Sequence, residues 1–121
     1  MKVRWTTDSI RLRITPTELE TLLQNEIVRQ SVTLGASGWI ARIVPGCAHT
    51  DYGIVDGSLQ VNLSAHDTSR LAEPHVEGVY FNPTTVQPVR LYIEKDLACE
   101  HPRAAEAQET ETETFAAPAS T

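Results

Sequence analysis

The chain has 121 residues and a formal net charge of −6, with 40% hydrophobic and 21% charged residues. This length suits one domain with its own hydrophobic core, and the composition argues against a disordered chain. The sequence has no run of eighteen apolar residues that would span a membrane. Its two cysteines are too few for a disulfide framework, and its acidic balance argues against nucleic-acid binding. Because no apolar leader follows Met1, we expect a cytoplasmic protein.

Two β-strands are predicted before the first helix. Residues 2–5 and 9–15 both alternate apolar with basic side chains, which is the period of two typical of a half-buried strand. The three residues between them suit a turn. In the second strand the even-numbered residues are apolar and would face the interior, so Arg11 and Arg13 would face the other way.

A capped helix and two further strands follow. Thr15 and Glu18 have the spacing of a capping box, and Pro16 stands at the first helical position. Residues 27–34 and 39–44 have strand patterns and are separated by a turn that contains two glycines.

The same order of elements then recurs. Residues 58–64 match residues 9–15 at an offset of 49 residues. Ser64 would cap a second helix, and two strand patterns between residues 76 and 93 complete the set. Two βαββ pseudo-repeats therefore predict an α+β fold: an antiparallel sheet or half-open barrel with the helices on one face.

The composition of the chain changes near residue 103. Residues 100–121 contain five acids and one base, Arg103, and they show no periodic apolar face. Such a stretch buries too little surface to offset its ordering entropy. We therefore predict a domain over residues 1–103 and a disordered acidic tail, rich in Thr, Glu and Ala, over residues 104–121. Phe115 is the one residue of this tail that could dock on another surface.

The outward positions of the first and last strands define a candidate binding face. Guanidinium groups bind phosphate or carboxylate with two parallel hydrogen bonds, so this face predicts a site for a small anion or a partner protein. Two other interpretations stay open: a solvated face whose arginines pair with glutamates, and coverage of the face by the acidic tail. The candidate residues are Arg4, Arg11, Arg13, Arg90, Tyr92, Glu94 and Lys95.

An enzymatic alternative uses the same arginines. Glu94 or Asp96 in the same cleft would supply an acid–base group for a small enzyme that acts on a phosphorylated or carboxylated substrate. We expect a non-catalytic domain without a cofactor instead, because the sequence contains no glycine-rich phosphate loop and no G-x-S-x-G or HExxH motif.

Two Cys-x-His units could chelate a metal ion. Cys47 and His49 form the first unit, and Cys99 and His101 form the second, with Asp96 nearby. Because this spacing differs from that of zinc fingers, we predict no metal site. Cys99 next to His101 could also be a nucleophile, but a free cysteine is more often a small buried apolar residue.

Two segments carry a family resemblance. Residues 9–15 read Ser-Ile-Arg-Leu-Arg-Ile-Thr, and residues 94–99 read Glu-Lys-Asp-Leu-Ala-Cys. They resemble the Ser-x-Arg-Leu-Arg-x-Thr and Glu-Lys-Asp-Phe-x-Cys motifs of a family of small uncharacterised bacterial proteins, a domain of unknown function, with Leu97 in the aromatic place. The resemblance covers residues 1–103. It implies one compact domain in which the two segments are adjacent, and it implies no activity.

Overall fold

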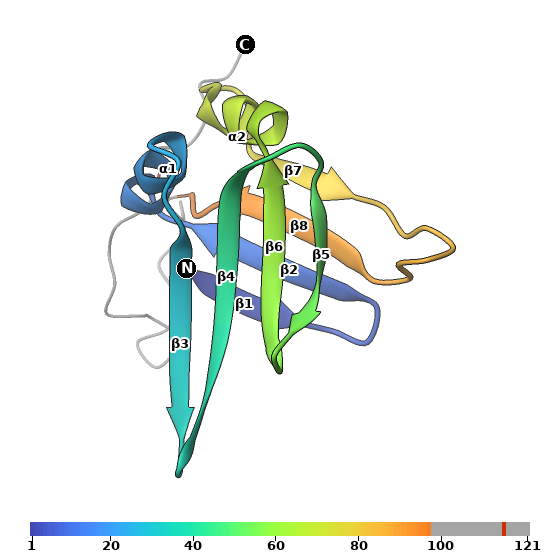
Figure 1. The fold of residues 1–121 in the computed structure, drawn as a ribbon. Helices are drawn as coiled ribbons and strands as arrows, with labels where there is room; N and C mark the ends of the chain where they lie inside the picture. The colour runs from blue at the N-terminus through green and yellow to red at the C-terminus, as the bar shows by residue number, and fades with distance from the viewer. Residues whose placement is uncertain (98–114, 116–121) are drawn as a thin grey trace, which may run out of the picture.

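Two four-stranded β-sheets lie face to face, with two helices at one end, in a computed structural model of the chain (Figure 1). The structure describes residues 1–97 and residue 115. The elements along the chain are β1 (Lys2–Trp5), β2 (Ser9–Ile14), α1 (Pro16–Leu23), β3 (Val28–Leu34), β4 (Ser37–Cys47), β5 (Asp51–Val55), β6 (Ser58–Ser64), α2 (Ala65–Ala72), β7 (Gly78–Phe81) and β8 (Arg90–Lys95).

The first sheet has the strand order β1-β2-β8-β7, and the second sheet has the order β3-β4-β6-β5. In each sheet the outer pairs are antiparallel and the central pair is parallel. The predicted α+β class is confirmed, but the strands form two mixed sheets in place of one antiparallel sheet. The reason is that each half of the chain contributes one hairpin to each sheet, so that strands from distant parts of the sequence meet in the middle.

The two halves of the chain share the order hairpin, helix, hairpin. The pairing of Arg4 with Arg11 in the first half corresponds, 49 residues later, to the pairing of Gly53 with Gln60. The structure therefore shows ββαββ halves, one strand longer than the predicted βαββ units. The additional strand in the second half is β5, which the sequence analysis missed because Gly53 interrupts its alternating pattern.

The cap residues predicted from the sequence begin both helices. The Thr15 hydroxyl accepts a hydrogen bond from the Glu18 N–H at 3.2 Å, and the Glu18 carboxylate accepts one from the Thr15 N–H at 3.0 Å. The Ser64 hydroxyl accepts from the Asp67 N–H at 3.1 Å. Each such cap stabilises a helix by about 1 kcal/mol, which matters for helices of only eight residues. Neither helix in the described part of the chain has the length and apolar character that a membrane-spanning helix needs.

The hydrophobic core lies between the sheets. Figure 1 shows the strands of the two sheets crossing at a steep angle, so their inner faces cover each other. The helices close one end of this arrangement with Leu22 and Leu71; the sequence analysis placed them over one face. The buried strand residues are Ile10, Leu12, Ile14, Val79, Leu91 and Ile93 in the first sheet, and Val28, Ala41, Ile43, Leu59, Val61 and Leu63 in the second.

Phe115 packs on the folded domain. Its N–H donates a hydrogen bond to the Asp96 carbonyl oxygen at 2.7 Å, and it forms a parallel bridge with Leu97. Its side chain lies partly buried against the core, beside a cavity of about 290 Å³. The predicted domain end at residue 103 and the rest of the predicted tail over residues 104–121, which is residues 104–114 and 116–121, lie outside the described residues.

Candidate anion-binding face

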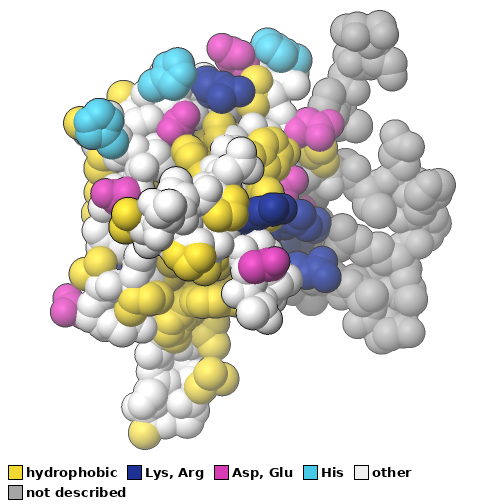
Figure 2. All heavy atoms as spheres, turned by 90° about the vertical axis from the view of Figure 1, so that its right-hand side faces the viewer, with side chains coloured by type: hydrophobic (Ala, Val, Ile, Leu, Met, Phe, Trp, Pro, Cys, Tyr) yellow, Lys and Arg dark blue, Asp and Glu magenta, His cyan; other side chains and the backbone are white. Residues whose placement is uncertain are grey.

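The outer face of the first sheet carries several basic side chains from β1 and β2. Arg11 lies opposite Arg4 and Arg13 lies opposite Lys2 across the antiparallel β1–β2 pair. Opposite residues in such a pair share one face, with Cβ atoms about 4.5–5.5 Å apart, and like charges in these positions destabilise the pair. Figure 2 shows Lys and Arg side chains gathered at one side of the molecule. We call the cluster of Lys2, Arg4, Arg11 and Arg13 the basic face.

Two carboxylates neutralise part of the basic face. Arg11 Nε lies 2.6 Å from Glu94 Oε1, an ion pair without an aligned hydrogen bond, and the Arg11 guanidinium lies 5.1 Å from the centre of the Tyr92 ring. Lys2 Nζ lies 2.8 Å from Asp96 Oδ2. These contacts place Glu94 and Tyr92 beside Arg11.

Arg4 and Arg13 form no ion pair with any carboxylate of the described residues. Arg4 is exposed and Arg13 is half-buried. Together with Lys2, Val3 and Arg11, they line a hollow of about 180 Å³ on the outside of the sheet. The hollow therefore presents to solvent two guanidinium groups that have no counter-ion among the described residues.

Tyr80 on β7 extends the cluster around Glu94. Its hydroxyl donates a hydrogen bond to Glu94 Oε2 at 3.5 Å, and its ring lies 5.6 Å from that of Tyr92. Burial raises the pKa of Tyr80, and the negative charges of Glu94 and Glu77 raise it further. The hydroxyl therefore keeps its proton at neutral pH and helps to hold Glu94 beside Arg11. The sequence analysis missed Tyr80, because the pairing of β7 with β8 cannot be read from a local pattern.

Arg90 lies on the same face of the sheet but away from the hollow. It pairs with Ser9, two positions along β2 from Arg11 and four from Arg13, and it does not line the hollow. At about 3.3 Å per residue, these separations along the strand are about 7 and 13 Å. The sequence analysis grouped Arg90 with Arg11 and Arg13 because alternation assigns a face to each residue, but alternation gives no position along that face.

Lys95 does not join the basic face. It follows Leu91 and Ile93 at the spacing of two residues, so its side chain points inward, where it is buried. Its Nζ donates a hydrogen bond to the Glu73 carbonyl oxygen at 2.9 Å and lies 5.6 Å from the centre of the Phe115 ring.

Burial lowers the pKa of Lys95 from its ordinary value of 10.5. Between the lowered folded-state pKa and 10.5, the unfolded chain binds more protons than the folded one, so the contribution of this group to stability increases with pH. We expect the Tm of the wild-type protein to rise relative to that of Lys95→Met as the pH increases toward 10.5. A constant Tm difference across this range would contradict burial of the ammonium group.

The enzymatic alternative requires Glu94 or Asp96 in the same cleft as the arginines. Glu94 is paired with Arg11, and Asp96, only 3% exposed, is paired with Lys2. Both carboxylates therefore lie beside cations as counter-ions, and the enzymatic alternative stays a prediction.

The described residues among the metal-binding candidates do not form a metal site. The Cys47 thiol donates to the Val44 carbonyl oxygen at 3.4 Å. Across residues 1–97, no three His, Cys, Asp or Glu side chains lie close enough to hold a metal ion. Cys99 and His101 lie outside the described residues, so the second Cys-x-His unit and a nucleophilic Cys99 stay predictions.

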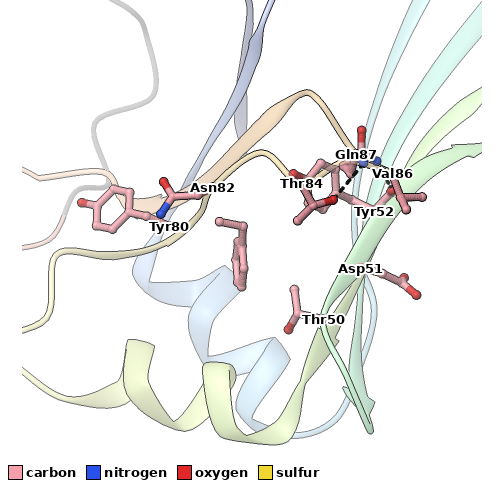
Figure 3. A pocket seen from close by; sticks show the side chains of 9 residues that line it. Thr50, Asp51, Tyr52, Tyr80, Asn82, Thr84, Val86 and Gln87 are labelled. Carbon is pink, nitrogen blue, oxygen red and sulfur yellow. Dashed lines mark hydrogen bonds between the residues drawn. The ribbon is translucent and has the colours of Figure 1, made fainter.

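The largest cavity described, of about 530 Å³, lies elsewhere, between β5, β7 and the β7–β8 loop (Figure 3). The Tyr52 hydroxyl donates to the Val89 carbonyl oxygen, and Gln87 Nε2 donates to the Tyr52 carbonyl oxygen at 2.9 Å. Burial raises the pKa of Tyr52. Figure 3 shows Asp51 and Tyr80 pointing away from the cavity, so its wall brings no charged groups together. The sequence analysis did not find this cavity because the loop that forms one wall has no periodic pattern.

Comparison with protein families gives a match over residues 1–119 to DUF7009, a family of unknown function. The match extends past residue 103, where the resemblance seen in the sequence ended, and it includes Phe115. Comparison with curated proteins and with solved structures gives no match.

Proposed function

Because the chain belongs to DUF7009, a family of unknown function, we propose a function from the geometry of the basic face. The chain is a non-catalytic domain that binds the phosphate or carboxylate group of a small anion or a partner protein. The observation that carries this proposal is the hollow of about 180 Å³ beside Arg4 and Arg13, which pair with no carboxylate of the described residues.

The pseudo-symmetry of the fold supports a role for these cations beyond folding. The positions of Arg11 and Arg13 are occupied in the second half by Gln60 and Asn62, which pair with β5 in the same register. The second sheet therefore forms the equivalent strand pair without opposing like charges. The same backbone arrangement forms in the second half without these cations. Folding alone therefore does not explain their presence in the first sheet.

The size and chemistry of the hollow fit an oxyanion. A water molecule occupies roughly 30 Å³ of liquid volume, so the hollow has room for a group of several heavy atoms. Guanidinium groups bind phosphate and carboxylate with two parallel hydrogen bonds, and each charge-assisted bond contributes about 1.5–3 kcal/mol. Glu94 and Asp96 act in this proposal as counter-ions that hold Arg11 and Lys2 in place.

Substitution of one unpaired arginine is expected to weaken anion binding without unfolding the domain. We expect Arg13→Gln and Arg4→Gln each to lower the affinity for inorganic phosphate by about ten- to a hundredfold, because each removes charge-assisted hydrogen bonds. Isothermal titration with inorganic phosphate, and with a short oligoglutamate peptide, measures this loss and separates phosphate from carboxylate recognition. The Tm should change little, since surface arginines without ion pairs contribute little to stability.

The matched control is Arg29→Gln. Arg29 is an exposed arginine that lies opposite another arginine, Arg42, in an antiparallel pair of the second sheet. This variant removes the same charge and should bind like the wild-type protein. Equal losses in Arg13→Gln and Arg29→Gln would show that only net charge matters, and unchanged binding in both Arg4→Gln and Arg13→Gln would contradict the proposed site.

A further inference from the structure

The edge of the second sheet formed by β3 has no partner strand among the described residues. We propose that β3 pairs antiparallel with β3 of a second copy of this chain, so that the protein is a symmetric dimer. This inference is independent of anion binding, which takes place on the other sheet.

The edge strands differ in how they are protected against pairing. Natural edge strands are kept from pairing by shortness, by charges or by a covering loop. β1 and β7 have four residues each, β1 carries two cations, and β7 lies against α2. Gln87 covers the edge of β5 by donating to the Tyr52 carbonyl oxygen. β3, by contrast, has seven residues, no proline, and Arg29 as its single charged residue.

The far half of β3 also exposes apolar side chains. Val32 is 43% exposed and Leu34 is 71% exposed. Val32 pairs with Trp39, whose ring lies 5.1 Å from that of the exposed Trp5. Figure 1 shows the β3–β4 hairpin extending beyond the first sheet. A long, nearly uncharged edge next to exposed apolar residues is a typical site of strand pairing.

The sequence of β3 is complementary to itself. In an antiparallel pair centred on Ser31, the exposed Leu34 lies opposite Val28 of the partner subunit, a buried core residue, and Val32 lies opposite Gln30 of the partner subunit. Arg29 lies opposite Thr33 of the partner subunit, so the pairing places no like charges opposite each other. The arrangement has two-fold symmetry and uses both free edges, and it therefore closes as a dimer.

The mass of the full chain in solution tests this proposal. We expect light scattering coupled to size exclusion, at about 100 µM protein, to give twice the mass of one chain. Ser31→Lys places two ammonium groups opposite each other at the centre of the interface and should give the monomer mass. Thr85→Lys adds the same charge to an exposed position in the β7–β8 loop and should stay a dimer.

Charge pairing between two variants makes the test specific for β3. Ser31→Lys and Ser31→Glu should each be monomeric alone and should form a mixed dimer when combined, because opposite charges then meet at the centre. Ser31 is exposed, so both variants should keep the circular dichroism spectrum of folded Thr85→Lys; Leu34→Glu, at a second exposed position, should also give a monomer. A monomeric wild-type chain, a dimer that persists in Ser31→Lys and Leu34→Glu, or a mixture that stays monomeric would each overturn the proposal.

Discussion

Leu12→Ala is expected to lower the free energy of unfolding by about 2–5 kcal/mol. Leu12 has 0% of its surface exposed and lies in β2, between its register partners Val3 on β1 and Ile93 on β8. Truncation removes buried methyl groups and leaves a cavity in the core between the two sheets, where both sheets limit relaxation. Urea unfolding followed by circular dichroism measures the loss.

A matched truncation at the surface provides the control for Leu12→Ala. Val86 is 91% exposed, so Val86→Ala should change the free energy of unfolding by less than about 0.5 kcal/mol. A Leu12→Ala variant as stable as Val86→Ala would contradict a core between the sheets. It would also remove the basis for assigning Arg11 and Arg13 to the outer face.

Gly78→Ala is expected to destabilise the protein by about 1–3 kcal/mol. A Cβ atom at residue 78 would lie 2.7 Å from the Ile93 carbonyl oxygen and 3.1 Å from the Glu94 Cα. Both are backbone atoms of β8, so they cannot rotate away as the end of a side chain can. Because Gly78 is the register partner of Glu94, the same change should push Glu94 away from Arg11. Thermal unfolding measures the first effect.

Gly53→Ala is the control for the glycine substitution. Gly53 is also on an edge strand, and a Cβ atom there would meet nothing within 4 Å. Alanine has the better strand propensity, so Gly53→Ala should be neutral or stabilise by up to about 1 kcal/mol. If Gly78→Ala were as stable as Gly53→Ala, the close approach of β7 and β8 would be wrong.

Local patterns predicted the elements of the fold better than their arrangement. Alternation around Leu12 predicted β2, and hydroxyl side chains three residues before an acid predicted both helix starts. The parallel pairing of β2 with β8 joins segments about 80 residues apart. No local period contains this information, and the division of the strands between two sheets therefore appeared only in the structure.

The candidate site was predictable to a similar extent. Alternation assigned Arg4, Arg11 and Arg13 to one face, and the structure showed that Arg4 lies opposite Arg11. The grouping of Lys95 with these residues does not hold, because its odd number in β8 already places it with the inward-facing Leu91 and Ile93. The pairing of each arginine with a counter-ion depends on side-chain positions across three strands. The sequence alone could not predict these pairs.

A crystal structure of the full chain grown in selenate would locate bound anions directly by the anomalous signal of selenium. If the outward-facing arginines of β1 and β2 form a receptor for oxyanions, the strongest peak should lie in the hollow between Arg4 and Arg13. An empty hollow in a crystal that binds selenate elsewhere, such as beside Arg29 and Arg42 on the other sheet, would contradict this assignment.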